Sequence, residues 1–356
     1  MVYPILFIST LVLAGVSELY SKRELIEITK EKKIMSNYLL FFSFTCMFLV
    51  SSVRKDVGID YIQYSSLQIP MVLSGDYSNV EFLYRYVIKI GYLIGKNQMV
   101  FVLTHLIILL FSYKAFINNS TNYLFSMYIF LFSGFFNHSL NIMRQSIATA
   151  IFLYAIKFIF ERKFIKYVIS IAVSFLFHKT AIIFFPIYFL YGVRFNIKRS
   201  IIILITAIMA KPLVNKGLFF IATNYNIYRN YLNKNFVAAP LSGTYVMINI
   251  FVMVLFLTIY ILNNNSLNKS QSFYFYIQIL TICILIYYDI IPNYDRIMFM
   301  LFSCQIFSIP CLIESVKNKK FKKIFTIFTL ILYLIVFYRI YVMQNIGGTF
   351  PYKSIL

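Results

Sequence analysis

Residues 99–117 read MVFVLTHLIILLFSYKAFI, an apolar run whose single charged side chain is Lys114. A helix rises 1.5 Å per residue, so about twenty such residues cross ~30 Å of hydrocarbon. The whole chain of 356 residues shares this character, since 60% of it is hydrophobic. Only 13% is charged, about half the ~25% of a soluble domain. The sequence therefore predicts an all-α, polytopic integral membrane helical bundle.

Further apolar runs predict further spans. They cover residues 1–20, 38–53, 123–137, 142–160, 244–262, 273–289, 297–315 and 324–340. Three other regions are ambiguous. Segment 80–96 is charged enough to be an interfacial amphipathic helix instead of a span. Segment 167–191 is either one long span or a hairpin of two short helices with His178 at its tip. Segment 200–222 contains Pro212, which predicts a broken or kinked helix.

The basic loops decide the orientation, because short cytoplasmic loops carry an excess of Lys and Arg. These residues are Lys22, Arg23, Lys30, Lys32 and Lys33; Arg162, Lys163 and Lys166; Arg194, Lys198 and Arg199; and Lys317, Lys319, Lys320, Lys322 and Lys323. These four basic loops lie on the same side of the membrane only if segment 167–191 crosses the membrane twice and segment 80–96 does not cross it. We therefore expect a single polytopic domain, residues 1–356, with about twelve crossings and both termini outside. The outer segments are then 54–97, 138–145, 178–179, 223–243, 289–296 and 341–356.

The first outer segment begins with residues 54–64, RKDVGIDYIQY, where opposite charges and tyrosines alternate. One interpretation is a neutralised loop that caps the bundle. The other is a site for sugar binding and acid/base chemistry, with carboxylates accepting from hydroxyls and tyrosine rings stacking on sugars. Its candidate residues are Arg54, Asp56, Asp60, Tyr61 and Tyr64. Glu81, which opens the next helix, is either a further acid/base candidate or a simple helix-terminal acid.

Three more outer elements carry polar side chains. Asn141, Arg144 and Gln145 cluster at the start of a span, where hydrogen-bond donors and the helix dipole favour an anion. A snorkelling arginine is the alternative. His178 at the hairpin tip is either a packed histidine or a functional one. Asp295 and Arg296 are either a local ion pair or part of the same outer site.

Arginine and lysine are distributed differently in the expected topology. Arg54, Arg85, Arg144, Arg229, Arg296 and Arg339 lie outside, whereas lysine dominates the cytoplasmic loops. Arginine binds phosphate bidentately, so its excess outside predicts a phosphorylated or pyrophosphorylated ligand. The net charge of +21 therefore reflects topology and this ligand, and we expect no nucleic acid partner. Neither metal-ligand spacing nor a nucleotide-binding motif is present, and we expect no cofactor and no metal.

The ordered set of these residues resembles the EpsG-like branch of the Wzy-type polysaccharide polymerases. The resemblance extends from about residue 40 to the end, and the 54–64 loop and Asn141–Gln145 carry most of it. It implies a glycosyltransferase in the bacterial plasma membrane, with its active site facing outside. Such an enzyme joins oligosaccharide repeat units carried on undecaprenyl diphosphate into a surface polysaccharide, such as an O-antigen, capsule or exopolysaccharide, without metal or nucleotide.

The resemblance also suggests roles and partners. Arg144 and Arg54, with Arg296, would bind the diphosphate, and the general base would be Asp60, His178 or Glu81. Tyr61 and Tyr64 would contact the sugars. Expected partners are the lipid-linked glycan donor and acceptor, the lipid bilayer, a flippase and a chain-length regulator. The alternatives are an outer-face ligase or transferase of the same pathway, and a flippase or transporter of the lipid-linked oligosaccharide.

Overall fold

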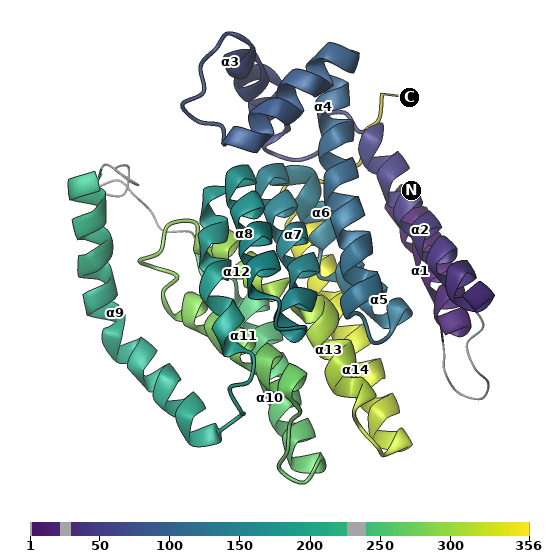
Figure 1. Ribbon diagram of the computed structural model, residues 1–356, viewed down its shortest axis with the longest axis vertical. Helices are drawn as coiled ribbons and strands as arrows, with labels where there is room; N and C mark the ends of the chain where they lie inside the picture. The colour runs from purple at the N-terminus through teal and green to yellow at the C-terminus, as the bar shows by residue number, and fades with distance from the viewer. Residues whose placement is uncertain (1, 22–29, 226–239, 356) are drawn as a thin grey trace. The chain divides into compact units, whose positions relative to one another are not determined.

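The computed structural model describes residues 2–21, 30–225 and 240–355. The described residues form helices, with one isolated β-bridge between Arg54 and Ser354. The elements are α1 Val2–Ser21, α2 Lys30–Ser52, η1 Gln63–Gln68, α3 Ile69–Leu73, α4 Phe82–Asn119, α5 Tyr123–Phe132, α6 Phe135–Asn141, α7 Met143–Phe160, α8 Phe164–Phe177, η2 Lys179–Leu190, α9 Ile197–Tyr225, α10 Gly243–Leu262, α11 Lys269–Ile286, α12 Tyr294–Phe302, α13 Gln305–Glu314, α14 Lys319–Phe337 and η4 Tyr338–Met343 (Figure 1).

The predicted all-α polytopic membrane fold is confirmed. In the described part of the chain, nine helices are long and apolar enough to cross a membrane. Three shorter apolar helices, α5, α8 and η2, accompany them. The predicted span 123–137 is divided into α5 and α6 at Gly134, which has a φ of +82°. A Cβ at Gly134 would lie 1.9 Å from the ring of Tyr341, so only glycine fits this break.

Helix α4 contains the predicted boundary between segment 80–96 and the span 99–117. Gly95 and Lys96 have non-helical backbone angles and divide the helix. A Cβ at Gly91 would lie 2.7 Å from Cα of Val100, so the two parts turn back against each other. The first part has an exposed apolar stripe formed by Phe82, Tyr86 and Ile90. It is thus a separate amphipathic helix, and its position in the membrane interface stays a prediction.

The predicted hairpin over 167–191 is confirmed as two short helices, α8 and η2, with His178 between them. The hydroxyl of Tyr167 donates to the carbonyl of Phe184 over 2.5 Å, and the rings of Phe164 and Tyr188 lie 4.9 Å apart. These contacts hold the two helices antiparallel. Of the two forms predicted for segment 200–222, α9 has the kinked one: it continues through Pro212 and changes direction near its middle (Figure 1).

The chain forms two compact units. The first comprises residues 1–188 and 305–356, and its central helix is α7, where residues 145–153 are all buried. The hydroxyl of Ser174 on α8 donates to the carbonyl of Ala148 over 2.9 Å, a close approach that small residues allow. The second unit comprises residues 189–304. In it the Lys211 ammonium lies 2.7 Å from the Asp289 carboxylate. That residues 1–356 form a single domain stays a prediction.

Candidate active site

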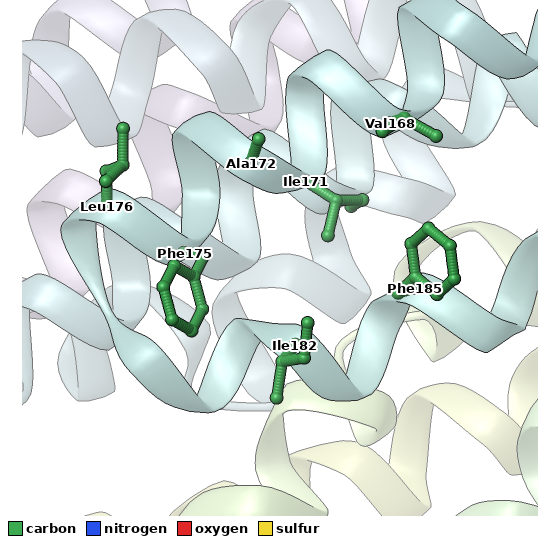
Figure 2. Close-up of a pocket in the computed structure, with 7 residues that line it drawn as sticks. All are labelled: Val168, Ile171, Ala172, Phe175, Leu176, Ile182 and Phe185. Carbon is green, nitrogen blue, oxygen red and sulfur yellow. The ribbon is translucent and has the colours of Figure 1, made fainter.

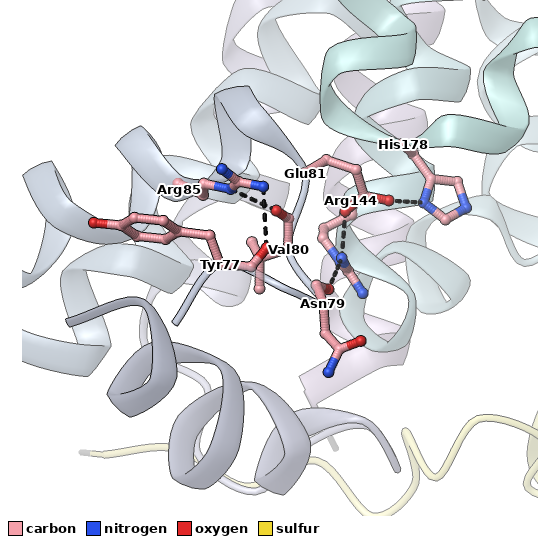
Figure 3. Close-up of polar contacts among 7 residues, drawn as sticks. All are labelled: Tyr77, Asn79, Val80, Glu81, Arg85, Arg144 and His178. Carbon is pink, nitrogen blue, oxygen red and sulfur yellow. Dashed lines mark hydrogen bonds and ion pairs between the residues drawn. The ribbon is translucent and has the colours of Figure 1, made fainter. Parts of the chain in front are cut away.

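The carboxylate of Glu81 joins three parts of the first unit that are distant in sequence. One of its oxygens, Oε2, forms an ion pair with Nη1 of Arg144, and the other, Oε1, lies 3.1 Å from Nδ1 of His178 (Figure 3). Glu81 precedes α4, Arg144 lies in the first turn of α7, and His178 follows α8. The side chains of Glu81, Arg144 and His178 are 10%, 18% and 20% exposed. The cluster is therefore mostly buried but still reachable.

Arg144 is held by several acceptors. Its Nη1 also donates to the main-chain carbonyl of Asn79 over 3.0 Å, and Tyr64 accepts hydrogen bonds from both its side chain and its main chain. Among the described residues, no hydrogen-bond acceptor pairs with its buried Nε. A planar guanidinium can donate hydrogen bonds to acceptors in these separate directions at the same time, which a lysine ammonium cannot do.

The turn before Glu81 is fixed by a second arginine. Arg85 donates from Nε to the carbonyl of Val80 over 2.6 Å and from Nη2 to the carbonyl of Tyr77 over 3.0 Å (Figure 3). Its guanidinium also lies over the Tyr77 ring, 5.0 Å from the centroid. Arg85 therefore organises the segment that presents the Asn79 carbonyl and the Glu81 carboxylate.

The electrostatics of the cluster keep Glu81 ionised. Burial alone would raise its pKa, but the hydrogen bond from His178 and the charge of Arg144 lower it from 4.5 to about 2. Burial raises the pKa of Tyr64, with Arg144 opposing that effect. A carboxylate with so low a pKa is a weak base at neutral pH. Glu81 is thus suited to orient His178 and to neutralise the charge of Arg144, and not to accept a proton.

The Glu81 contact fixes the orientation of His178. A carboxylate only accepts hydrogen bonds, so Nδ1 of His178 carries a proton, and in the neutral form of the ring Nε2 has the lone pair. The tautomer follows from this partner, in the manner of carboxylate–histidine pairs in which the carboxylate holds the ring. His178 has an extended backbone, with a φ of −158° at the end of α8. The chain turn therefore points the ring out of the hairpin toward Glu81.

The side chain of Arg54 connects the 54–64 loop to the end of α6. Its side chain is fully buried, and Nη1 donates to the carbonyl of Leu140 and, over 2.8 Å, to that of Val57. Nη2 lies 3.0 Å from the sulfur of Met143, and Cζ of the guanidinium lies 5.1 Å from the centroid of the Phe101 ring. Burial lowers the pKa of Arg54 to about 10. A guanidinium with these contacts holds the loop. Its predicted role in diphosphate binding stays a prediction.

The C-terminal segment fastens the 54–64 loop. The amide of Gly58 donates to the carbonyl of Gly348 over 2.9 Å, and the amide of Lys55 donates to that of Lys353 over 3.0 Å. Gly58 has a φ of +101°, and a Cβ there would lie 2.7 Å from the carbonyl oxygen of Leu140. Only glycine allows this loop to lie so close to the end of α6. The terminal residues, part of the predicted outer segment 341–356, therefore hold the loop in place.

The other loop candidates lie around these backbone contacts. The amide of Asp60 donates to Oδ1 of Asn141 over 2.8 Å, so Asn141 ties the loop to the end of α6. Its predicted role as an anion ligand stays a prediction. One face of Tyr61 stacks on Phe101, 4.6 Å away. Asp56 is exposed in a turn with a φ of +52°. The remaining predicted residue, Gln145, is buried in α7.

Two further predicted site residues are on α12. Asp295 and Arg296 belong to the second unit, where they are half-buried in the first turn of α12, and their role stays a prediction. Lys22, Arg23 and Arg229 lie outside the described residues, as does most of the outer segment 223–243. Searched over the described residues, no group of three His, Cys, Asp or Glu side chains is arranged to hold a metal ion. Sequence reasoning missed Asn79, since a main-chain carbonyl leaves no residue signature.

Comparison with known families identifies a matching family model. A family model described as the EpsG family matches residues 37–354, most of the chain. No curated protein and no solved structure matches the chain. The matched range contains the whole Glu81 cluster and the loop that Arg54 supports.

Proposed function

Because the chain belongs to the EpsG family, which indicates a role of the polysaccharide-polymerase type, we propose that it joins lipid-diphosphate-linked oligosaccharide repeat units. The lipid is undecaprenyl diphosphate, and the reaction takes place at the outer face of the bacterial plasma membrane. The growing glycan passes from its lipid diphosphate to the sugar of the next lipid-linked unit. The observation that carries the proposal is the Glu81 carboxylate bridging Arg144 and His178.

The cluster supplies the groups that this transfer needs. The acceptor hydroxyl oxygen forms a bond to the anomeric carbon of the donor, and the bond from that carbon to the diphosphate breaks. The electron pair of the broken bond leaves with the diphosphate. The hydroxyl proton moves to Nε2 of His178, the ring nitrogen that Glu81 leaves free. His178 is therefore favoured over Asp60 as the base.

Arg144 is the cation for the leaving diphosphate. Because Nη1 already serves Glu81 and Asn79, the contact to diphosphate falls to the remaining edge of the guanidinium. Charge that develops on the leaving oxygen is stabilised there without reorganisation, since Glu81 and Tyr64 already hold the side chain in place.

The low pKa of Glu81 predicts how Glu81→Gln changes stability with pH. A carboxyl with a folded pKa of about 2 and an unfolded value of 4.5 stabilises the folded state fully above pH 4.5. That stabilisation disappears as the pH falls toward 2, because the unfolded chain then binds the proton more readily. We expect the wild type to be more stable than Glu81→Gln at pH 7 by about 3 kcal/mol. The difference shrinks on acidification, measured as thermal unfolding midpoints in detergent from pH 7 to pH 3.

Glu161→Gln is the matched control, because Glu161 pairs with Lys163 over 2.7 Å on the exposed surface. Exposed ion pairs contribute little, so its midpoint should follow the wild type at every pH. A gap between wild type and Glu81→Gln that keeps the same size down to pH 3 would contradict the ionised Glu81.

A deletion strain tests the function itself. Loss of a polymerase leaves single repeat units attached at the cell surface, whereas loss of a ligase leaves long chains unattached. Loss of a flippase leaves repeat units on the cytoplasmic side of the membrane. We expect single units outside, seen as a short-chain band on gels of surface glycan, with long chains restored by the plasmid-borne gene. Long unattached glycan, or units trapped inside, would exclude the polymerase.

A further inference from the structure

The hairpin of α8 and η2 has an apolar groove on its exposed side. The groove has a volume of about 350 Å³, and Figure 2 shows its lining side chains projecting from both helical segments. These are Val168, Ile171, Ala172, Phe175, Leu176, Ile182 and Phe185. All seven are apolar, so the groove is suited to hydrocarbon and offers no partner for a hydrogen bond.

The shape of the groove follows from its two helices. The lining residues of α8 recur at intervals of three and four, which places them on one stripe about 12 Å long at 1.5 Å per residue. Side chains three apart in a 3₁₀ helix align, so Ile182 and Phe185 form a straight opposite edge. The inner side of the hairpin is fixed separately, because Phe184 stacks on Phe152 of α7 at 3.8 Å. The groove is thus an open hollow on a rigid support.

One end of the groove lies near the turn that carries His178. Leu176 lines that end and is two residues from His178, whose ring contacts Glu81. Lys179, the next residue, is exposed, and Arg144 is on the far side of Glu81. An occupant that fills the groove would therefore have its polar end among two cations and a histidine. This arrangement matches a lipid with a long hydrocarbon chain and an anionic head.

We propose that this groove binds the first isoprene units of a polyprenyl diphosphate, with the diphosphate beside Arg144 and Lys179. The identity of the occupant rests on the proposed function, since a polymerase of this type needs the lipid carrier at the catalytic histidine. Binding of the hydrocarbon chain along α8 sets the distance from the diphosphate to Nε2 of His178. The groove therefore positions the donor and selects lipid-linked glycan over free glycan.

Photolabelling of the full-length protein in lipid nanodiscs tests the groove. The probe is a polyprenyl diphosphate with a diazirine on its first isoprene units, and the labelled residues are read by mass spectrometry. We expect labels on α8 and η2 at the groove residues. Unlabelled undecaprenyl diphosphate should displace the probe, while an excess of phosphatidylglycerol should not. Ala172→Phe fills the hollow and should lower labelling about tenfold, the scale of discrimination for small changes in apolar pockets.

Ile169→Phe is the matched control, because Ile169 is exposed on the same helix and does not line the groove. It should label like the wild type. Labels spread over other lipid-facing helices, or equal labelling by a diazirine phospholipid, would overturn the proposal and identify an ordinary lipid contact. Labelling needs no turnover, so groove labelling without polymer formation would reject only the polymerase. Polymer formation with the label elsewhere would reject only the groove.

Discussion

Replacing His178 by Ala should lower the rate of polymer formation by about 10²–10⁴-fold, the usual contribution of a general base. The variant keeps the groove and Arg144, so lipid-linked substrate should still bind, and the loss should fall on the turnover rate. The measurement is the initial rate of chain growth by purified protein with lipid-linked repeat units, alongside the concentration of substrate that gives half the maximal rate.

Two further variants separate chemistry from packing. His178→Gln keeps an N–H donor for the Glu81 carboxylate, which lies 3.1 Å from Nδ1 in the wild type, but it has no basic nitrogen. It should be as inactive as His178→Ala while unfolding at nearly the wild-type temperature. Ser170→Ala, which removes only a hydroxyl bonded within α8, should keep full activity. If His178→Gln polymerises at the wild-type rate, another residue, with Asp60 the first candidate, is the base.

Arg144→Lys should reduce long-chain polysaccharide to single repeat units, with a rate loss of about 10²–10³-fold. The positive charge remains, but a lysine ammonium cannot serve Glu81, Asn79 and Tyr64 while also contacting diphosphate. Glu81 would then be held less firmly, and His178 with it. Gel profiles of surface glycan from a strain expressing the variant, with the protein level measured by immunoblot, give the result.

Arg199→Lys provides the control for this charge-conserving change, since Arg199 is an exposed side chain of α9. It should leave the glycan profile unchanged. Long chains made by Arg144→Lys at normal protein level would exclude Arg144 from the reaction. A double variant, Glu81→Gln with Arg144→Lys, should lose little more activity than either single variant, because both substitutions break the same contact.

The helices could be predicted from the sequence because each depends on a local pattern. Apolar runs long enough to cross a membrane predicted α1, α2, α7 and α10. The hairpin of α8 and η2 was predicted because the basic loops on either side of it must lie on the same side of the membrane. The break inside α4 at Gly95 and Lys96 also fell where composition changes. These features need only neighbouring residues and the thickness of a bilayer.

The site was only partly accessible from the sequence. Glu81, Arg144 and His178 were candidates on chemical grounds, yet nothing local indicated that Glu81 contacts the other two. Arg54 gives a second example. Its residue type suggested a phosphate ligand, and only the structure shows that its buried guanidinium supports the loop through the carbonyls of Val57 and Leu140.

The sequence alone thus determined an all-helical membrane protein, its short hairpin and the kinds of side chain available for chemistry. Tertiary structure alone decided which of those side chains meet. Contacts across 63 and 97 residues join Glu81 to Arg144 and to His178, and they depend on how α4, α7 and α8 pack. The assignment of His178 as base and Glu81 as its ionised partner rests on those contacts. A pKa is set by burial and neighbouring charges in space, which no spacing along the chain records.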